Sequence, residues 1–151
     1  MNRRNFMGFG VLAMATLPAT LSALSTIDFR QTKPDAWTAK TVEDAIKALY
    51  GDVKLEAGDV KVKAPKVASN GGAVPVTVKS DIAAKSVAVL QNVNPESLVC
   101  VFNCDKDSII DYTFKIKMKG SGTITAIVEG QDGKFYKGEV SLEVAKGGCE
   151  G

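Results

Sequence analysis

The apolar positions of the chain change their period near residue 52. Before that point, the segment TAKTVEDAIKALYG has the spacing of one face of an amphipathic helix. The apolar positions are Val42, Ala45, Ile46, Leu49 and Tyr50. Thr41 can cap the N-terminus of this helix and Gly51 can end it. The pattern therefore predicts one short helix, lying across an end or a face of the domain.

After residue 52, apolar and polar residues alternate in short runs. The runs are VKVKAP, VPVTVKS, SVAVLQN, LVCVFNC, DYTFKIKM, TITAIVEG, KFYKGEV and SLEVA. They are separated by turn residues, namely Gly71-Gly72, Asn94-Pro95, Gly120, Asp132-Gly133 and Gly138. Roughly seven or eight short strands with no second helix predict an all-β fold, an immunoglobulin-like antiparallel β-sandwich. We expect the outward lysines Lys61, Lys63, Lys115 and Lys117 to solvate one face and protect sheet edges.

Residues 1–25 have the pattern of an export signal. Arg3 and Arg4 precede a moderately apolar run, Met7 to Leu24, and small residues follow. This is a signal peptide of the twin-arginine (Tat) type, and it predicts export to the bacterial periplasm. An uncleaved membrane anchor is the alternative, although the run is short for a membrane span and contains Gly and Pro. We expect a linker at 26–40 and one folded domain at 41–145.

Composition removes several function classes. The 151 residues are 45% hydrophobic and 24% charged, which suits one globular domain. Histidine is absent, which excludes most zinc, copper and haem sites and every Ser-His or Cys-His catalytic pair. We therefore expect no metal and no cofactor. Without Arg3 and Arg4 the 19 basic residues fall to 17 and balance the 17 acidic ones, so nothing favours nucleic acid or an anionic membrane as a partner.

Two of the three cysteines lie in one predicted strand. Cys100 and Cys104 are four residues apart in LVCVFNC and point to the same face as Leu98 and Phe102. In a straight strand their Cα atoms are about 13 Å apart, whereas a disulfide needs less than about 7 Å. Three interpretations remain open: buried apolar thiols, a bridge if the strand turns after Phe102, or a redox or metal role.

The third cysteine, Cys149, is in the C-terminal segment VAKGGCEG. Gly147 and Gly148 precede it, and five residues separate it from Val144, a span of about 17 Å when extended. Residues 146–151 are thus predicted to be a flexible, slender arm that can carry a thiol into a pocket of another protein. An intermolecular disulfide and a tail without function are the simpler alternatives.

These features together resemble the SoxY family of the thiosulfate-oxidation (Sox) system. The resemblance lies in the twin-arginine leader, the short helix, the small β domain, NVNPESLV and the closing EVSLEVAKGGCEG. The family's tail pattern is Gly-Gly-Cys-Gly-Gly. Gly147, Gly148, Cys149 and Gly151 match it, and Glu150 replaces a glycine.

The resemblance implies a carrier rather than an enzyme. In the family, the tail cysteine holds thiosulfate-derived sulfur covalently, and the subunit pairs with SoxZ, a related β-sandwich protein. SoxAX couples thiosulfate to the cysteine, SoxB releases sulfate, and in many organisms SoxCD oxidises the remaining sulfur. Carried over to this chain, Cys149 is the attachment point, and Lys146, Gly147, Gly148, Glu150 and Gly151 form the arm.

Glu150 sets this chain apart from the family pattern. Its carboxylate and the terminal carboxylate of Gly151 both disfavour the thiolate of Cys149 and an anionic adduct on it. Salt and exposure limit the effect to about 1 kcal/mol or less. A competing hypothesis is an exported immunoglobulin-like binding module whose Cys149 makes a structural intermolecular disulfide. An enzyme is the third hypothesis, and the missing histidine argues against it.

Overall fold

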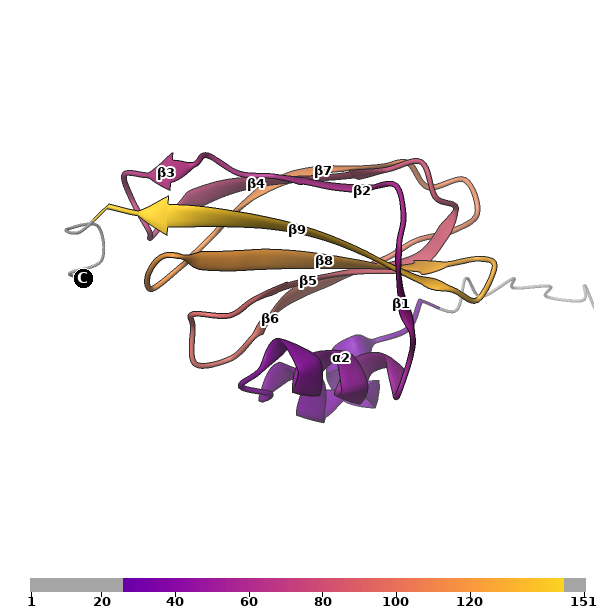
Figure 1. The fold of residues 1–151 in the computed structure, drawn as a ribbon. Helices are drawn as coiled ribbons and strands as arrows, with labels where there is room; N and C mark the ends of the chain where they lie inside the picture. The colour runs from indigo at the N-terminus through magenta and orange to yellow at the C-terminus, as the bar shows by residue number, and fades with distance from the viewer. Residues whose placement is uncertain (1–25, 146–151) are drawn as a thin grey trace, which may run out of the picture.

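The computed structural model describes residues 26–145. The leader with Arg3 and Arg4 and the arm at 146–151 with Cys149 lie outside the described residues. The described chain is mostly β and forms two facing sheets with helices against one of them (Figure 1). The predicted fold class, an immunoglobulin-like sandwich with a short helix, is confirmed.

The larger sheet has the strand order β1-β9-β8-β5-β6, with β3 also paired to β9. Its strands are β1 (Leu55–Ala57), β3 (Val67–Ala68), β5 (Ala84–Gln91), β6 (Leu98–Asn103), β8 (Gly122–Gly130) and β9 (Phe135–Val144). The smaller sheet has the order β2-β4-β7, formed by β2 (Val60–Lys63), β4 (Val74–Ser80) and β7 (Ile110–Ile116). Pairing is antiparallel except for β1 and β3, which both run parallel to β9.

One glycine that we expected in a turn lies inside a strand. The runs KFYKGEV and SLEVA are not two strands but the single strand β9, and Gly138 is in its middle. A Cβ at Gly138 would collide with the backbone oxygen of Val60 in the facing sheet. Glycine is therefore needed here because two backbones approach each other closely, and not because the chain turns.

The predicted helix is present as α2 (Val42–Tyr50). The Thr41 hydroxyl accepts a hydrogen bond from Asp44 N at 3.1 Å, and Gly51 ends the helix with a positive φ of 82°. Both residues do what the sequence suggested, because a free N–H needs a capping acceptor and the last turn needs a left-handed residue.

The stretch 26–40, expected as a linker, contains two short helical segments that pack on the domain. They are α1 (Phe29–Thr32) and the 3₁₀ helix η1 (Pro34–Trp37). Phe29 and Ala36 are buried, and the Trp37 Nε1 donates to Phe29 O at 3.1 Å. Four-residue helices are too short to show a period in the sequence, which is why the pattern did not reveal them.

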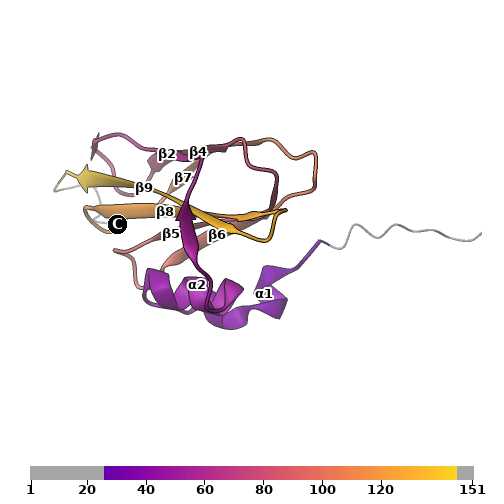
Figure 2. The same ribbon diagram turned by 45° about the vertical axis from the view of Figure 1, so that its right-hand side comes forward.

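Two apolar layers lie on either side of the larger sheet. One fills the space between the sheets, and the other lies between the larger sheet and the helices (Figure 2). The central strands β5 and β8 contribute to both layers, with Val87 and Val89 facing the smaller sheet and Ala88 and Leu90 facing the helices. The second layer explains why β5 is buried at every position except Lys85, since both of its faces are covered.

Candidate functional site

The structure fixes the point from which the C-terminal segment leaves the domain. Backbone N–H groups of Glu143 and Ala145 donate to Lys66 O and Ala68 O, each at 2.9 Å. The N–H of Val144 between them donates to Ser121 Oγ at 2.9 Å. The last three described residues are therefore held from both sides, at the end of the sandwich where β9 terminates (Figure 1).

The loops at this end are tied together by two amide side chains in the NVNPESLV region. Asn94 Nδ2 donates to Lys117 O at 2.7 Å, and Asn94 Oδ1 accepts from Lys119 N at 2.9 Å. The fully buried Gln91 accepts from Val93 N and Asn94 N, each at 2.7 Å. Sequence reasoning noted this stretch only as similar to the family, whereas its role is to join the β5–β6 loop to the segment after β7.

Cys149 is four positions after Ala145 in the sequence. Covalent geometry alone limits the distance between their Cα atoms to about 14 Å. Cys149 and the arm residues Lys146, Gly147, Gly148, Glu150 and Gly151 lie outside the described residues. The thiol is thus confined to the neighbourhood of this end of the sandwich.

The other two thiols are free and lie inside the sandwich, so the bridge between Cys100 and Cys104 is not formed. Burial raises the pKa of Cys100 to about 12. Burial also raises the pKa of Cys104, while its hydrogen bond with Tyr112, at 3.5 Å, opposes part of the rise. Both thiols are neutral at physiological pH, and a neutral thiol is a poor nucleophile.

A bulge in β6 places Leu98 on the opposite face of the sheet from these cysteines. The register of β5 and β6 shifts so that Leu98 is opposite Leu90 and Cys100 is opposite Val89, which leaves Val99 as an extra residue. Cys100 and Phe102 face the space between the sheets, whereas Leu98 faces the helices. The expectation that Leu98 shares their face was wrong, because a bulge inverts the alternation before it.

The register also places Cys104 far from the arm. Asn103, next to Cys104, is level with Phe135, the first residue of β9, across the strands β5 and β8. Ten residues, or about 33 Å, lie between Phe135 and Ala145. An arm that reaches about 14 Å cannot bring Cys149 to the 7 Å or so that a disulfide with Cys104 needs.

Cys100 is out of reach for the same reason. It is level with Gly138, seven residues or about 23 Å before Ala145 along β9. Three strand spacings add about 14 Å across the sheet, and Cys100 is largely covered by the smaller sheet. The chain therefore offers no internal partner thiol for Cys149, and any disulfide that Cys149 makes joins it to another molecule.

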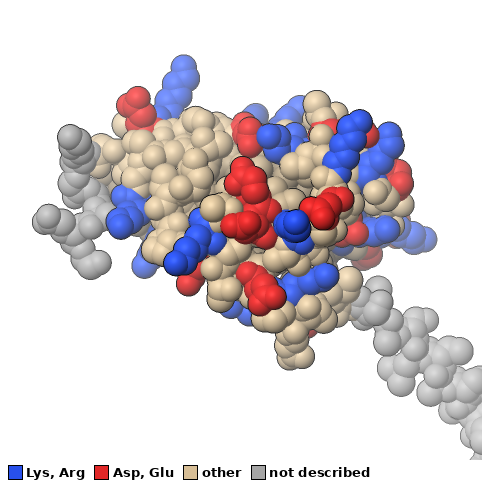
Figure 3. Space-filling model, turned by 60° about the horizontal axis from the view of Figure 1, so that its bottom comes forward, with Lys and Arg blue, Asp and Glu red and all other residues tan. Residues whose placement is uncertain are grey.

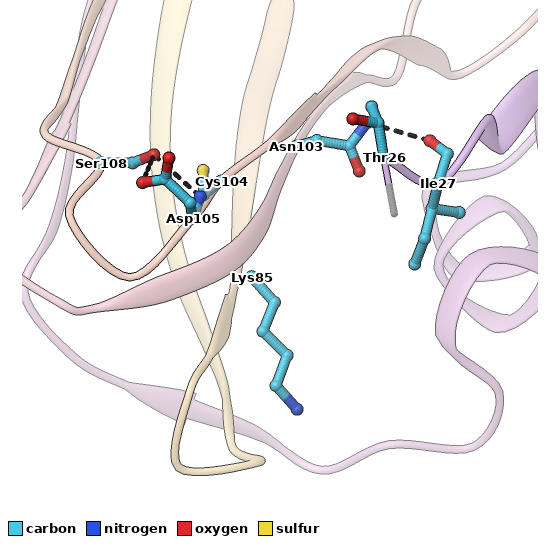
Figure 4. Close-up of a pocket in the computed structure, with 7 residues that line it drawn as sticks. All are labelled: Thr26, Ile27, Lys85, Asn103, Cys104, Asp105 and Ser108. Carbon is cyan, nitrogen blue, oxygen red and sulfur yellow. Dashed lines mark hydrogen bonds between the residues drawn. The ribbon is translucent and has the colours of Figure 1, made fainter. Parts of the chain in front are cut away.

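A hollow of about 440 Å³ lies beside Cys104 (Figure 4). The strand register places it near the beginning of β9, away from the end of that strand. It is lined by Thr26, Ile27, Lys85, Asn103, Cys104, Asp105 and Ser108. Its polar groups bond to one another: Ser108 Oγ donates to Asp105 Oδ1 at 2.8 Å, and Asn103 Nδ2 donates to Ile27 O at 2.9 Å. The Cys104 thiol beside this hollow is protonated, because burial raises its pKa, and it is therefore a poor nucleophile.

Charges of both signs are interspersed over the molecular face drawn in Figure 3. The predicted outward lysines Lys61, Lys63, Lys115 and Lys117 are all exposed. Within residues 26–145, no three His, Cys, Asp or Glu side chains are grouped so that they could hold a metal ion. No helix in this range is long and apolar enough to cross a membrane.

The profile of a protein family described as "Sulfur oxidation protein SoxY" matches residues 46–149, so the match ends at Cys149. The chain belongs to the SoxY family. The match covers α2 from its middle, all nine described strands and most of the C-terminal arm. SoxY membership supports a role as a carrier in sulfur oxidation.

A solved SoxY structure agrees with this assignment. The sulfur carrier protein SoxY from Chlorobium limicola f thiosulfatophilum superposes with a TM-score of 0.64 at 25% identity, over 70% of this chain and 96% of that one. A superoxide reductase (neelaredoxin) from Ignicoccus hospitalis matches with a TM-score of 0.50 at 17% identity, over 58% and 80% of the two chains. That second likeness shows the fold alone. A comparison with curated proteins finds no match.

Proposed function

We propose that this SoxY-family chain is a periplasmic carrier that holds thiosulfate-derived sulfur covalently on Cys149. The observation that carries the proposal is the division among the three thiols. Cys100 and Cys104 pack against the core of the sandwich and are protonated, whereas Cys149 follows the anchored end of β9 and is the last residue of the family match. The twin-arginine leader supports export of the folded chain to the periplasm.

The chemistry needs only a thiol from this chain. The Cys149 thiolate and thiosulfate join through a new S–S bond, and two electrons pass to an oxidising haem partner of the SoxAX type. Hydrolysis of the terminal S–SO₃⁻ bond by a SoxB-like enzyme consumes water and releases sulfate and protons, which leaves a persulfide on Cys149. A SoxCD-like enzyme can then oxidise that sulfur. Thiolate attack and exchange at sulfur is ordinary cysteine chemistry.

The domain contributes position rather than catalysis. The hydrogen bonds of Glu143, Val144 and Ala145 fix where the arm begins, so Cys149 is presented from one end of a rigid body. Tethering keeps the intermediate at a high effective concentration near each enzyme and prevents its loss by diffusion. A chain without histidine is suited to this role, because the partner enzymes supply the metals and the bases.

A SoxZ-like β-sandwich subunit is the stable partner that we propose. The carrier would act as a heterodimer, with SoxAX-, SoxB- and SoxCD-like enzymes binding in turn. Nothing in the mixed surface charge of the described chain favours nucleic acid.

The variant Cys149→Ser tests the proposal, with Cys104→Ser as the matched control. Protein is purified from cells grown on thiosulfate, and intact-mass spectrometry records sulfur-containing additions. We expect additions on the wild type and on Cys104→Ser and none on Cys149→Ser, with the Tm of Cys149→Ser unchanged. Covalent dimers without added sulfur in the wild type, or additions that persist in Cys149→Ser, would contradict the carrier role.

A further inference from the structure

The free edges of the two sheets differ in how they are protected. An edge strand exposes unpaired backbone groups that attract other strands, and charged residues or short length protect it. In the described chain, β1 has three residues and includes Glu56, and β3 has two residues. The edge strand β2 carries Lys61 and Lys63, and β7 carries Asp111 and Lys115.

The edge strand β6 has neither kind of protection. Its six residues, LVCVFN, include no charged residue and no proline. The bulge at Val99 is at its start, so the four residues from Cys100 to Asn103 keep a regular register with β5. It is thus the longest regular edge in the described chain that lacks a charged residue, which makes it suited to pairing with another strand.

The backbone groups that this edge presents can be identified. Cys104 N donates to Lys85 O in the continuation of the ladder. Because backbone groups alternate in direction along an antiparallel strand, those of Phe102 and Cys100 also face β5. The N–H and C=O groups of Val101 and Asn103 therefore point away from β5, on a side where β6 pairs with no strand of the described chain. The segment Thr26–Arg30 lies beside these two residues across a hollow, and no backbone hydrogen bond joins that segment to β6 within residues 26–145.

Apolar side chains lie directly behind this edge. Phe102 packs against Tyr112 and Phe114 of β7, with ring centroids 4.4 and 5.7 Å apart, across the open side of the sandwich. Val99, Val101 and all three of these rings are only partly buried. A strand laid along β6 would cover them and remove apolar surface from water.

We propose that the free edge of β6, from Cys100 to Asn103, is the docking surface for an uncharged β-strand of the partner subunit. The identity of that partner, the SoxZ-like subunit, rests on the proposed function. The strand would bond to the outward N–H and C=O groups of Val101 and Asn103 and extend the larger sheet, which is the β-augmentation mode of recognition. Its own side chains must be uncharged, because they would face Val99, Val101 and Phe102.

This placement is compatible with the carrier arm. The edge of β6 runs along a side of the sandwich, whereas β9 terminates at one end (Figures 1 and 2). Asn103, at the far end of β6, is level with the beginning of β9 and not with its end. A partner on β6 therefore leaves Cys149 accessible to enzymes.

The test compares Asn103→Pro with Asn103→Ala in the mature full-length chain. Both variants lose the exposed amide that donates to Ile27 O, but only proline removes the backbone N–H that points away from β5. Binding to the purified SoxZ-like subunit of the same organism is measured by analytical ultracentrifugation. We expect Asn103→Pro to weaken the complex about tenfold or more, since it leaves a partner carbonyl unpaired, and Asn103→Ala to change it less than about threefold.

Amide hydrogen exchange provides a second measurement in the wild type. The N–H groups of Val101 and Asn103 should exchange fast in the free chain and slowly in the complex. A complex that forms with both amides still exchanging fast would overturn the inference, and so would equal affinities of the two variants. Self-association through β6 with no effect of Asn103→Pro on the SoxZ-like complex would also overturn it.

These outcomes are independent of the sulfur chemistry. Cys149→Ser leaves β6 unchanged, so its complex with the SoxZ-like subunit should keep the wild-type affinity. A Cys149 that never carries sulfur refutes the carrier function and not the docking surface. A carrier that is loaded normally while its β6 amides stay unprotected in the complex refutes the docking surface and not the function.

Discussion

The cysteines in the interior of the sandwich differ in their surroundings from the cysteine that follows the end of β9. Inside, Cys100 and Cys104 lie among apolar side chains that raise the pKa of both thiols and keep them protonated. At the end of β9, hydrogen bonds hold the backbone up to Ala145, and Cys149 follows four residues later. In the interior, cysteine thus serves as an apolar packing residue. After the end of β9, cysteine is the proposed attachment point for sulfur.

The difference lies in what surrounds the sulfur. A buried thiol contributes contacts and stays inert, because the thiolate would lose its hydration. Cys149 follows the last strand in the sequence, and we expect its modification to leave the stability of the domain unchanged. Under the proposed function, two cysteines stay protonated in the folded domain while Cys149 carries the sulfur.

The largest expected difference between the interior cysteines and Cys149 is in their rates of thiol labelling. In the native protein at pH 8, iodoacetamide should modify Cys149 at least about 100-fold faster than Cys100, whose pKa of about 12 leaves almost no thiolate. In denaturant, all three cysteines should react at similar rates. Peptide mass spectrometry at timed intervals measures both. Equal rates for Cys100 and Cys149 in the native protein would contradict the account.

The aromatic ring of Phe102 should limit the access of reagents to the thiols of Cys100 and Cys104. Phe102→Ala removes the contacts with Tyr112 and Phe114 and should lower the free energy of unfolding by about 2–3 kcal/mol. Labelling of Cys104 should accelerate, while sulfur loading at Cys149 remains. Urea unfolding and the same labelling assay measure these effects. A loss of loading with an intact fold would show that the two regions are coupled.

Alkaline pH should weaken the folded domain through its buried thiols. Below pH 9 the Cys100 thiol is protonated in both states, so its contribution to stability is fully present. Between the ordinary pKa of 9.0 and about 12, the unfolded chain loses this proton and the folded chain does not, so the free energy of unfolding falls.

The slope for one such group is at most about 1.4 kcal/mol per pH unit. Cys100→Ala should remove this part of the slope in urea titrations between pH 8 and 11. The part due to Tyr112, whose pKa burial also raises to about 12, should persist. An unchanged slope in Cys100→Ala would contradict the environment assigned to Cys100.

The smallest expected effect concerns Glu150. Glu150→Gly removes a carboxylate next to Cys149 and should raise its labelling rate about two- to threefold at low ionic strength, with no difference at 1 M salt. Glu143→Gln, which removes an exposed carboxylate before the arm, is the control and should have less effect. A rate that does not respond to either variant would mean that Glu150 has another role.

The sequence predicted those parts of the fold that depend on periodicity and capping. The helix α2, with Thr41 and Gly51 at its ends, and the alternating strands β4 and β7 follow from local pattern. Gly138 was misinterpreted because the approach of Val60 is a contact between distant parts of the chain. The bulge at Val99 and the pairing of β3 with β9 were missed for the same reason.

The sequence alone leads to the prediction that Cys149 is the attachment point, but it does not indicate which residues hold the base of the arm. The Gly-Gly-Cys tail pointed to Cys149 from the sequence alone. The roles of Gln91, Asn94 and Ser121 at the base of the arm depend on loops that meet only in the folded chain. No local pattern distinguishes such amide and hydroxyl groups from ordinary loop residues.

Peptide-level mass spectrometry of the wild-type protein tests the central claim most directly. Protein is purified from the same cells grown with and without thiosulfate, and each of the three cysteine-containing peptides is measured without reduction. We predict sulfur-containing additions only in thiosulfate-grown cells and only on the peptide with Cys149. Additions on Cys100 or Cys104, or a Cys149 peptide that is unmodified under both conditions, would contradict the account.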